Sequence, residues 1–227
     1  MVAHPPKAAV YEQVARVGKA LGAPRRLELL DLLGQAPRTV EALATASGMS
    51  VANTSQHLQI LRVAGLVASS RDGLFVTYRL ASDDVAEFST KLRRLAESHL
   101  ADLERLKARF FASADDLDGL TSKQLLARVQ RGEVVLLDVR PTVEYAAAHI
   151  HGAVSIPHDE LERRIGELSK HRRVVAYCRG PYCVFAADAV KLLRRRGFFD
   201  ATRIEDGVVE WRARRLPVVA ARPEGRA

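Results

Sequence analysis

The sequence contains only two cysteines in 227 residues, and both lie in the short stretch CRGPYC at positions 178–183. So low a number excludes a disulfide-rich extracellular scaffold, and two cysteines alone cannot supply the four ligands of a structural zinc site. No run of about 18 apolar residues occurs, which excludes a membrane-spanning helix. The opening MVAHPPKAAVYEQV has no basic segment followed by an apolar one, so we expect no signal peptide and a cytoplasmic location.

Positive charge is in excess but is not concentrated in one part of the chain. The formal net charge is +8 and the pI is about 9.9. Residues 1–112 contain 15 Lys+Arg against 11 Asp+Glu, and residues 113–227 contain 20 against 16. A polyanionic partner such as nucleic acid must therefore be argued from sequence pattern, because net charge alone is not specific.

The pattern of the sequence changes at ASADDLDGL, residues 112–120. Before it, apolar residues recur at helical spacing, and after it β-rich runs alternate with helices. The length suits two domains of about 110 residues, each large enough to bury a core. We predict a first domain over residues 1–112, a linker over 113–119, a second domain over 120–220 and a tail over 221–227.

Two apolar stripes in the first half predict helices with an exposed seam. One stripe continues from residue 83 to 110 and predicts a single helix of about 28 residues. It is too long for one small domain to cover, so we expect it to pack against a partner helix in a homodimer; the alternative is packing within its own chain. A shorter stripe predicts an N-terminal helix of the same kind. The long stripe comprises Val85, Phe88, Leu92, Leu95, His99, Leu103, Leu106 and Phe110, and the short one Val10, Val14, Val17 and Leu21.

Residues 39–65 predict two short helices joined by a tight turn, which is the sequence form of a helix-turn-helix. Thr39 is a candidate N-cap for the first helix, and Ser50 for the second. Between them, Gly48 ends the first helix. On the second helix we expect an apolar inner face consisting of Val51, Leu58 and Leu61.

The second helix also has a dense set of uncharged polar side chains, which can hydrogen-bond base edges in a DNA major groove. The alternative is a polar face that is simply solvated. After this helix, residues 66–80 predict a β-hairpin around the turn pair Asp72-Gly73, and we expect Arg71 and Arg79 of this hairpin to reach phosphates. The candidate base-reading residues are Asn53, Thr54, Ser55, Gln56, His57 and Gln59.

Residues 10–110 resemble the ArsR/SmtB family of winged-helix repressors. The likeness is carried by PRRLELLDLL, then SQHLQILRVAGLV, then the RDG turn and TYRL. It implies a mainly α winged helix-turn-helix domain, a homodimer through the N-terminal helix and helix 83–110, and double-stranded operator DNA with half-sites about 34 Å apart as partner. Many members of this family sense metals, but this chain has no cysteine before Cys178 and only His99 on the last helix. We therefore expect no metal site and no cofactor.

The second half predicts an α/β domain with a parallel sheet and helices on both faces, because strands alternate with helices from residue 120 onward. Ligands bind such sheets at the carboxyl ends of strands, where Cys178 follows the apolar run 172–177. We expect backbone amides of the loop and of the next helix to converge on the Cys178 sulfur and to lower its pKa below the ordinary value of about 8.5. A phosphatase loop would need Arg six residues after the cysteine, where this chain has Val184.

Residues 120–219 resemble the rhodanese, or sulfurtransferase, domain. The likeness is carried by LLDVRPTVEYAAAHIHGAVSIP, by CRGPYC after a strand and by EDGVVEW followed by LP. It implies that Cys178 accepts sulfur as a persulfide and that Asp138, Arg140 and Glu144 form a structural motif with a buried charge pair. By the same likeness His149 and His151 are turn residues rather than metal ligands. The loop that surrounds the sulfur comprises Arg179, Gly180, Pro181, Tyr182, Cys183 and Val184.

Two residues of this loop depart from the usual pattern. Cys183 occupies a position that is often basic in thiosulfate-using relatives, which leaves Arg179 as the only cation of the loop, and Pro181 has no amide proton. Both changes weaken the case for thiosulfate as sulfur donor. Cys183 can instead resolve a modified Cys178 into a disulfide; the alternative is that it packs passively. The candidate catalytic residues are Cys178, Arg179 and Cys183.

Three hypotheses of function remain. The first is a transcriptional repressor whose second domain senses a small sulfur donor or oxidant at Cys178. The second is an active sulfurtransferase of thiosulfate or 3-mercaptopyruvate type, for which the DNA-binding half provides only targeting or dimerisation. The third is a catalytically silent second domain that binds an oxyanion.

Overall fold

The computed structural model describes residues 6–110 and 120–220, so the predicted linker 113–119 and the tail 221–227 lie outside the described residues. The chain divides into two compact units, Met1–Leu92 and Arg93–Ala227. This division falls inside one helix, which begins in the first unit and ends in the second. Each unit is described by itself below.

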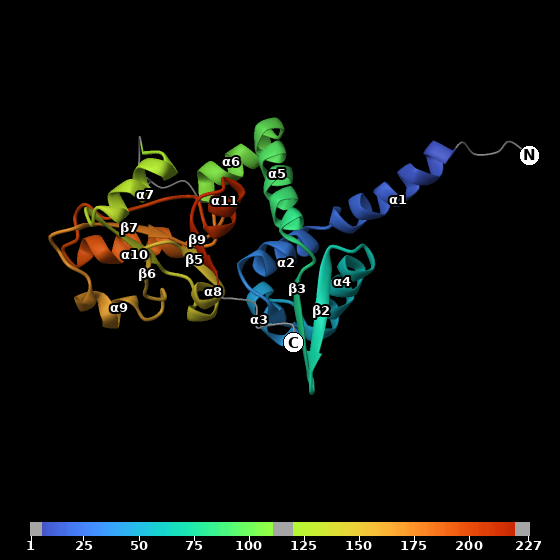
Figure 1. Ribbon diagram of the computed structural model, residues 1–227, viewed down its shortest axis with the longest axis horizontal. Coiled ribbons are helices and arrows are strands. Elements are labelled where there is room, and N and C mark those ends of the chain that lie inside the picture. The colour runs from blue at the N-terminus through green and yellow to red at the C-terminus, as the bar shows by residue number, and fades with distance from the viewer. Residues whose placement is uncertain (1–5, 111–119, 221–227) are drawn as a thin grey trace, which may run out of the picture. The chain divides into compact units, whose positions relative to one another are not determined.

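The first unit consists of four helices and a three-stranded antiparallel sheet, followed by the start of α5 (Figure 1). The strands have the order β1-β3-β2. The elements are α1 (Pro6–Leu21), α2 (Pro24–Gln35), β1 (Arg38–Thr39), α3 (Val40–Ser47), α4 (Val51–Val63), β2 (Val67–Asp72), β3 (Phe75–Leu80) and α5 (Asp83–His99).

Local sequence signals account for the helix-turn-helix α3–α4. The Thr39 hydroxyl accepts a hydrogen bond from the Ala42 amide, and the Ser50 hydroxyl accepts one from the Asn53 amide, so both predicted N-caps are confirmed. Gly48 ends α3 with a φ of 66°, a left-handed conformation that glycine adopts without strain. The predicted hairpin is present, with Ser69 of β2 opposite Tyr78 of β3. Its turn residues are Gly73 and Leu74 rather than the predicted pair Asp72-Gly73, because Asp72 is the last residue of β2 and pairs with Phe75.

The core of the first unit lies between α2, α4 and the sheet. Leu58 and Leu61 of α4 are fully buried, as predicted. The prediction for Val51 is wrong, because its side chain is exposed. Val51 is the first residue of α4, and the inward position near this end belongs instead to Thr54, whose hydroxyl is satisfied by the Ser50 carbonyl at 3.0 Å.

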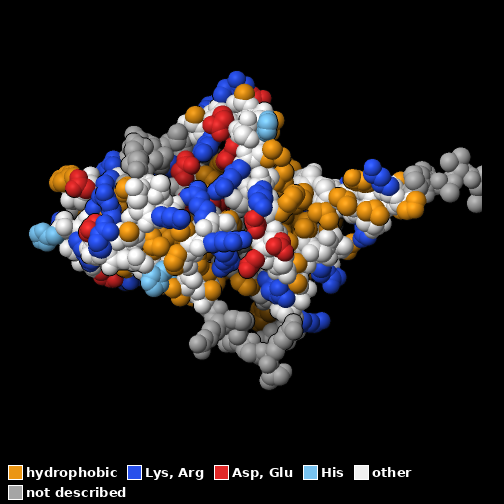
Figure 2. All heavy atoms as spheres, turned by 45° about the horizontal axis from the view of Figure 1, so that its top comes forward, with side chains coloured by type: hydrophobic (Ala, Val, Ile, Leu, Met, Phe, Trp, Pro, Cys, Tyr) orange, Lys and Arg blue, Asp and Glu red, His pale blue; other side chains and the backbone are white. Residues whose placement is uncertain are grey.

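The apolar face of α1 is largely uncovered within the unit. Figure 2 shows hydrophobic side chains along α1, at the right of the view. Val10, Tyr11 and Val14 are between 59% and 61% exposed, and only Ala20 and Leu21 at the end of the helix are buried. This face is free for a partner.

The predicted single helix 83–110 is in fact two helices, α5 and α6 (Ala101–Phe110), separated by Leu100. The chain turns sharply between them (Figure 1). The Ser98 hydroxyl donates to the Leu95 carbonyl at 3.0 Å, and such a bond competes with the helical backbone pattern and bends a helix. The apolar stripe therefore does not lie on one straight surface.

The second unit contains a parallel sheet of order β6-β4-β7-β8 and a separate pair β5-β9. All the strand pairs of the four-stranded sheet are parallel. After α6 the elements are α7 (Ser122–Gln130), β4 (Val134–Asp138), α8 (Thr142–Ala147), β5 (Ala148–Ile150), β6 (Val154–Ser155), α9 (Leu161–Arg164), a 3-10 turn η1 (Ile165–Glu167), β7 (Arg173–Tyr177), α10 (Phe185–Arg195), β8 (Thr202–Arg203), α11 (Val208–Ala213) and β9 (Val218–Ala220).

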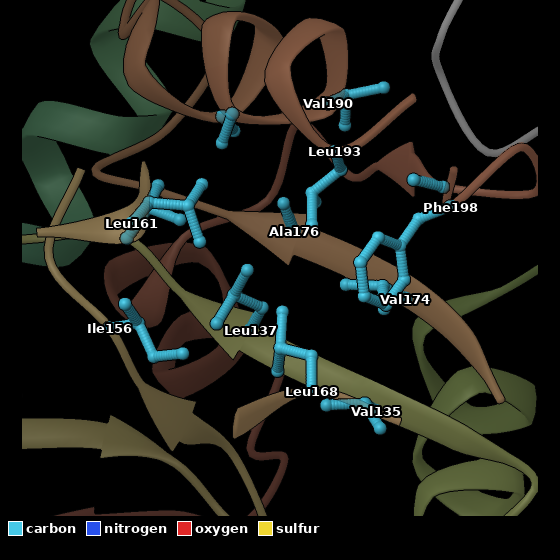
Figure 3. Packing of buried hydrophobic residues seen from close by; sticks show 14 of the residues in the cluster. Val135, Leu137, Ile156, Leu161, Leu168, Val174, Ala176, Val190, Leu193 and Phe198 are labelled. Atoms are coloured by element: carbon cyan, nitrogen blue, oxygen red, sulfur yellow. The ribbon is translucent and has the colours of Figure 1, made fainter. Parts of the chain in front are cut away.

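Helices cover both faces of this sheet, as predicted. Alternate residues of β4 point to opposite faces: Leu137 packs in the cluster with α9 and α10, and Leu136 in the cluster with α7 and α11. Figure 3 shows the first cluster, with Leu193 of α10 above Ala176 of β7. On the other face the single tryptophan, Trp211, is fully buried.

Two further features concern the periphery of the described chain. The antiparallel pairing of β5 with β9, in which His149 lies opposite Val219, joins segments about 70 residues apart and was not predicted. In the described residues, no helix combines the length and the apolarity that crossing a membrane requires.

Candidate functional site

The cysteine loop, residues 178–184, connects the buried central strand β7 to α10. β7 pairs with β4 on one side and β8 on the other, so the position of Cys178 at its carboxyl end is fixed by two neighbouring strands. The loop turns through Gly180, whose φ is 141°, and the Cys183 amide donates to the Gly180 carbonyl at 3.2 Å. The predicted location of Cys178 is therefore the observed one.

The two cysteines are both free thiols and lie in contact with the same core. Cys178 is 3% exposed, and its thiol donates a hydrogen bond to the Cys183 carbonyl at 3.4 Å. Cys183 is only partly buried. The pair thus has one member inside the domain and one nearer its surface.

The two thiols influence each other's ionisation in opposite directions. A hydrogen bond from Cys178, together with backbone amides of Arg179 and Phe185, lowers the pKa of Cys183 to about 7. The hydrogen bond to Cys183 and burial raise the pKa of Cys178 well above its ordinary value, although amides of Ala186 and Gly180 oppose this. The loop does create a thiol that ionises near neutral pH, but this thiol is Cys183. The prediction that it would be Cys178 is wrong.

Arg179, the only cation predicted for the loop, is engaged in an ion pair with Glu144. Its guanidinium donates to both carboxylate oxygens of Glu144 at 2.6–3.1 Å, and Glu144 is fully buried. A bidentate pair of this kind holds the arginine in place. Arg179 still contributes a positive charge near Cys183, where it lowers the pKa of that thiol slightly.

The predicted buried charge pair exists between Asp138 and Arg140. Both side chains are fully buried, and the guanidinium donates to the carboxylate at 2.6–3.2 Å. Arg140 also donates to the Ala148 carbonyl at 2.8 Å, and the Tyr177 hydroxyl donates to Asp138. This network ties the ends of β4 and β7 together and so supports the base of the cysteine loop.

Glu210 and Gly207 form a wall behind the loop that the sequence interpretation missed. The Glu210 carboxylate accepts a hydrogen bond from the Gly207 amide at 2.8 Å and lies against Gly180. A β-carbon at Gly207 would come within 2.8 Å of the Cys178 carbonyl oxygen, so only glycine fits there. The available signal was a glutamate three residues after a helix N-cap, which is typical of a capping box.

Two side chains of α5 reach the same region within the second unit. Arg93 donates to Glu210 at 2.5 Å, and the Tyr182 hydroxyl donates to Glu97 at 2.7 Å. The Arg93 guanidinium also lies 5.8 Å from the centre of the Tyr182 ring. Neither Arg93 nor Glu97 was singled out from the sequence, because both resemble ordinary exposed charges on an amphipathic helix.

Most of the predicted DNA-reading residues of α4 lie on its accessible side. Asn53, Gln56 and Gln59 are exposed, and Ser55 and His57 are half-buried. Thr54 is the exception and corrects the prediction, because it is fully buried and cannot contact a base edge.

The polar side of α4 is further organised by the hairpin. The Gln59 amide donates to the Tyr78 hydroxyl at 3.0 Å. In the hairpin, Arg71 and Arg79 are exposed, and Arg71 donates to the Gly73 carbonyl at 3.0 Å. The two arginines extend the accessible polar surface beyond α4.

The two histidines near β5 take part in local packing. His149 stacks on Tyr145 with ring centres 3.8 Å apart, and its Nδ1 lies 2.9 Å from the Tyr145 carbonyl oxygen. His151 is exposed in the following turn. Within residues 6–110 and 120–220, no three His, Cys, Asp or Glu side chains gather as a metal site would require.

Comparisons with known proteins match the two halves separately and the whole chain together. The model of the bacterial regulatory protein arsR family matches residues 23–69, and the model of the rhodanese-like domain matches residues 121–214. The HTH-type transcriptional regulator Rv0324 of Mycobacterium tuberculosis is 48% identical over 219 residues, which are 96% of each chain.

Two further relatives each cover one half. A sulfurtransferase of Allochromatium vinosum is 32% identical over 111 residues, 49% of this chain and 98% of that protein. A solution structure of the homodimeric winged helix-turn-helix DNA-binding domain of Mb0332 from Mycobacterium bovis, a possible ArsR-family transcriptional regulator, is 46% identical. It covers 45% of this chain and 94% of that chain with a TM-score of 0.41.

Proposed function

Since this chain belongs to the ArsR family of bacterial transcriptional regulators and carries a rhodanese-like domain in its second half, we propose that it is a repressor controlled by sulfane sulfur. The cysteine pair Cys178 and Cys183 is the sensing site, and operator DNA in the cytoplasm is the output. The observation that carries this proposal is a pair of neighbouring free thiols, of which Cys178 is buried and donates to the Cys183 carbonyl, and Cys183 has a pKa of about 7.

The pair provides both a nucleophile and a base. Cys178 attacks the outer sulfur of a hydropersulfide, RS–SH, while the Cys183 thiolate takes the Cys178 proton; the bond between the two donor sulfurs breaks and RS⁻ leaves. Cys183 then gives up its proton and attacks the Cys178 sulfur, which forms the disulfide and releases HS⁻. The two thiols are oxidised by two electrons, and the sulfane sulfur is reduced to hydrogen sulfide.

The surroundings of the pair favour a weakly charged donor. Arg179 is bound to Glu144, and the carboxylate of Glu210 lies beside Gly180. A thiosulfate dianion would meet a nearby negative charge and a cation whose charge is already paired with Glu144. A hydropersulfide or polysulfide carries its sulfane sulfur without a sulfonate group and therefore does not need an unpaired cation to hold it. We assign this class of donor to the site.

The DNA-binding function belongs to the first half of the chain. The exposed polar side chains of α4 supply base-edge contacts, and Arg71 and Arg79 supply phosphate contacts. The uncovered apolar side chains of α1, together with exposed Phe88 and Leu95 of α5, are suited to a homodimer interface. A twofold dimer would place two α4 helices in successive major grooves.

A gel-shift titration on DNA from upstream of the protein's own gene tests the proposal. The reduced protein should bind, and treatment with polysulfide should lower the affinity. Cys178→Ser should bind like the reduced wild type and lose the response, and in Cys183→Ser a mass gain of about 32 Da should persist because no disulfide can form. An unchanged polysulfide response in Cys178→Ser would show that the sensing site lies elsewhere.

A second candidate function is sustained sulfur transfer, which the likeness to the Allochromatium vinosum sulfurtransferase favours. In that case Cys178 persulfide passes its sulfur to an external acceptor on every cycle. Steady-state turnover with thiosulfate or 3-mercaptopyruvate as donor would support it, whereas a single burst equal to the protein concentration would support the sensor.

A further inference from the structure

The last two turns of α5 hold the cysteine loop at two points. Arg93 and Glu97 are four residues apart and therefore lie on one face of the helix. Arg93 donates to Glu210 at 2.5 Å in a pair whose side chains are 17% and 3% exposed. Glu97 accepts a hydrogen bond from the Tyr182 hydroxyl at 2.7 Å. Burial and Glu97 raise the pKa of Tyr182, so its hydroxyl remains a donor at neutral pH.

Each of these contacts is connected to a cysteine through one neighbouring residue. Tyr182 precedes Cys183 directly in the chain. On the other side, Glu210 binds the Gly207 amide and touches Gly180, and Gly207 lies against the Cys178 carbonyl. The side chains of α5 thus act on the backbone around both cysteines without touching either sulfur.

We propose that Arg93 and Glu97 are positioning residues that hold the cysteine loop in its reduced geometry and make α5 responsive to the state of the pair. This inference rests on the proposed sulfur-sensing function. Formation of the Cys178–Cys183 disulfide draws Cys183 out of its present hydrogen-bonded position and pulls Tyr182 with it. The Tyr182–Glu97 contact then opens, and α5 loses one of its two supports.

The coupling has to work in both directions. If the state of the thiols changes the Tyr182–Glu97 contact, then removal of that contact must change the chemistry of the thiols by the same free energy. The low pKa of Cys183 depends on the Cys178 thiol and on loop amides being held in place. A loosened loop should therefore return this pKa toward its ordinary value.

The charged groups around the pair come from several elements. Arg179 and Glu144 form one ion pair beside it, and Arg93 and Glu210 form another. His158 stacks on Phe185 at the start of α10, with ring centres 5.2 Å apart. None of these groups is altered by a change from Tyr182 to Phe or from Glu97 to Ala, so these two substitutions test the single contact.

The experiment measures the rate at which iodoacetamide alkylates the cysteines of the full-length protein as a function of pH. In Tyr182→Phe and in Glu97→Ala the midpoint should rise by about 0.5 unit from the wild-type value of about 7, a roughly twofold fall in the ionised fraction at pH 7. The double variant should shift no further than either single one, because both remove the same interaction. Glu87→Ala, which affects an exposed pair with Lys91 on the same helix, is the matched control.

A second measurement follows α5 directly. Amide hydrogen exchange at residues 93–99 should become faster when polysulfide converts the wild-type pair into the disulfide, and should not change in Cys178→Ser. Unchanged alkylation midpoints in both single variants, or unchanged exchange in the oxidised wild type, would overturn the positioning role.

The failure of this inference is distinguishable from the failure of the proposed function. If operator binding responds to polysulfide but the alkylation midpoints do not shift, the sensing function is supported and the positioning role of α5 is refuted. If the midpoints shift but operator binding does not change with polysulfide, the positioning role is supported and the sensing function is refuted.

Discussion

Gly207 provides a sharp test of the geometry behind the cysteine loop. A β-carbon at this position would lie 2.8 Å from the Cys178 carbonyl oxygen and from the carbonyl carbon and oxygen of Arg179. All three are backbone atoms and cannot rotate away as a flexible side chain would. The φ of Gly207 is −98°, which any residue adopts, so Gly207→Ala adds a steric conflict and no backbone strain.

The size of the effect follows from the distance. Ordinary van der Waals contact begins at 3.4 Å, so the end of β7 and the start of α11 must separate for the methyl group to fit. Overpacking of this kind costs about 1–3 kcal/mol, and each kcal/mol lowers the Tm of a domain of this size by roughly 3–5 °C. We expect the second unit of Gly207→Ala to melt roughly 3–15 °C lower than the wild type. The displaced loop should also raise the pKa of Cys183 from about 7 toward the ordinary value.

The single tryptophan makes this measurement specific to the second unit. Trp211 is fully buried on α11, four residues after Gly207, so its fluorescence follows the unfolding of that unit. Gly166→Ala is the matched control, because nothing lies within 4 Å of its β-carbon. This control should be neutral or stabilise slightly. If Gly207→Ala melts with Gly166→Ala and its thiols titrate as in the wild type, the wall behind the loop does not exist as described.

Three further predictions concern other parts of the chain. Asp138→Asn leaves Arg140 buried without its counter-charge and should cost about 3–5 kcal/mol in urea unfolding followed by tryptophan fluorescence. Cys178→Ala removes the largest cause of the low pKa of Cys183, so the pH midpoint of Cys183 alkylation should move up from about 7. A thiol whose pKa is lowered by folding stabilises the fold at high pH, and this stabilisation is lost as the pH falls through the folded-state pKa. The variant should therefore lack the gain in stability that the wild type shows above pH 7. Ser50→Ala removes the N-cap of α4 and should cost about 1 kcal/mol in thermal unfolding followed by circular dichroism, without a change in tryptophan fluorescence of the folded state.

The parts of the fold that could be predicted are those encoded by neighbouring residues. Thr39 and Ser50 cap helices through residues three positions away, and Gly73 lies in the turn of a hairpin whose two strands directly flank that turn. The position of Cys178 at the end of a strand follows from one apolar run and one helix start. Each of these signals is complete within a few residues, so no tertiary information is needed.

The features that could not be predicted depend on the tertiary surroundings of individual side chains. The ion pair of Arg179 was not predicted, because its partner Glu144 lies 35 residues earlier in the chain. Thr54 was assigned to the polar face because a threonine is polar, but a hydroxyl bonded to the carbonyl four residues back can be buried at little cost.

The lowered thiol pKa was predicted for Cys178 but belongs to Cys183, again because the surroundings of the side chain decide it. Amides near Cys178 were expected to dominate its pKa. The second thiol, at Cys183, outweighs them because two adjacent thiols cannot both ionise easily. Only the folded loop sets how close the two sulfur atoms lie.

The two contacts of α5 differ in a way that suits a switch. In the Arg93–Glu210 pair Glu210 is buried and Arg93 is largely buried, and separating such a pair costs several kcal/mol, so it acts as a fixed support. The Tyr182–Glu97 hydrogen bond involves a tyrosine that is 38% exposed, and its contribution is therefore at the lower end of the range of about 1.5–3 kcal/mol for a bond to a charged group. A tenfold change in operator affinity requires about 1.4 kcal/mol. The weaker contact alone is thus large enough to transmit the signal, and the stronger one keeps α5 attached to the domain while it does so.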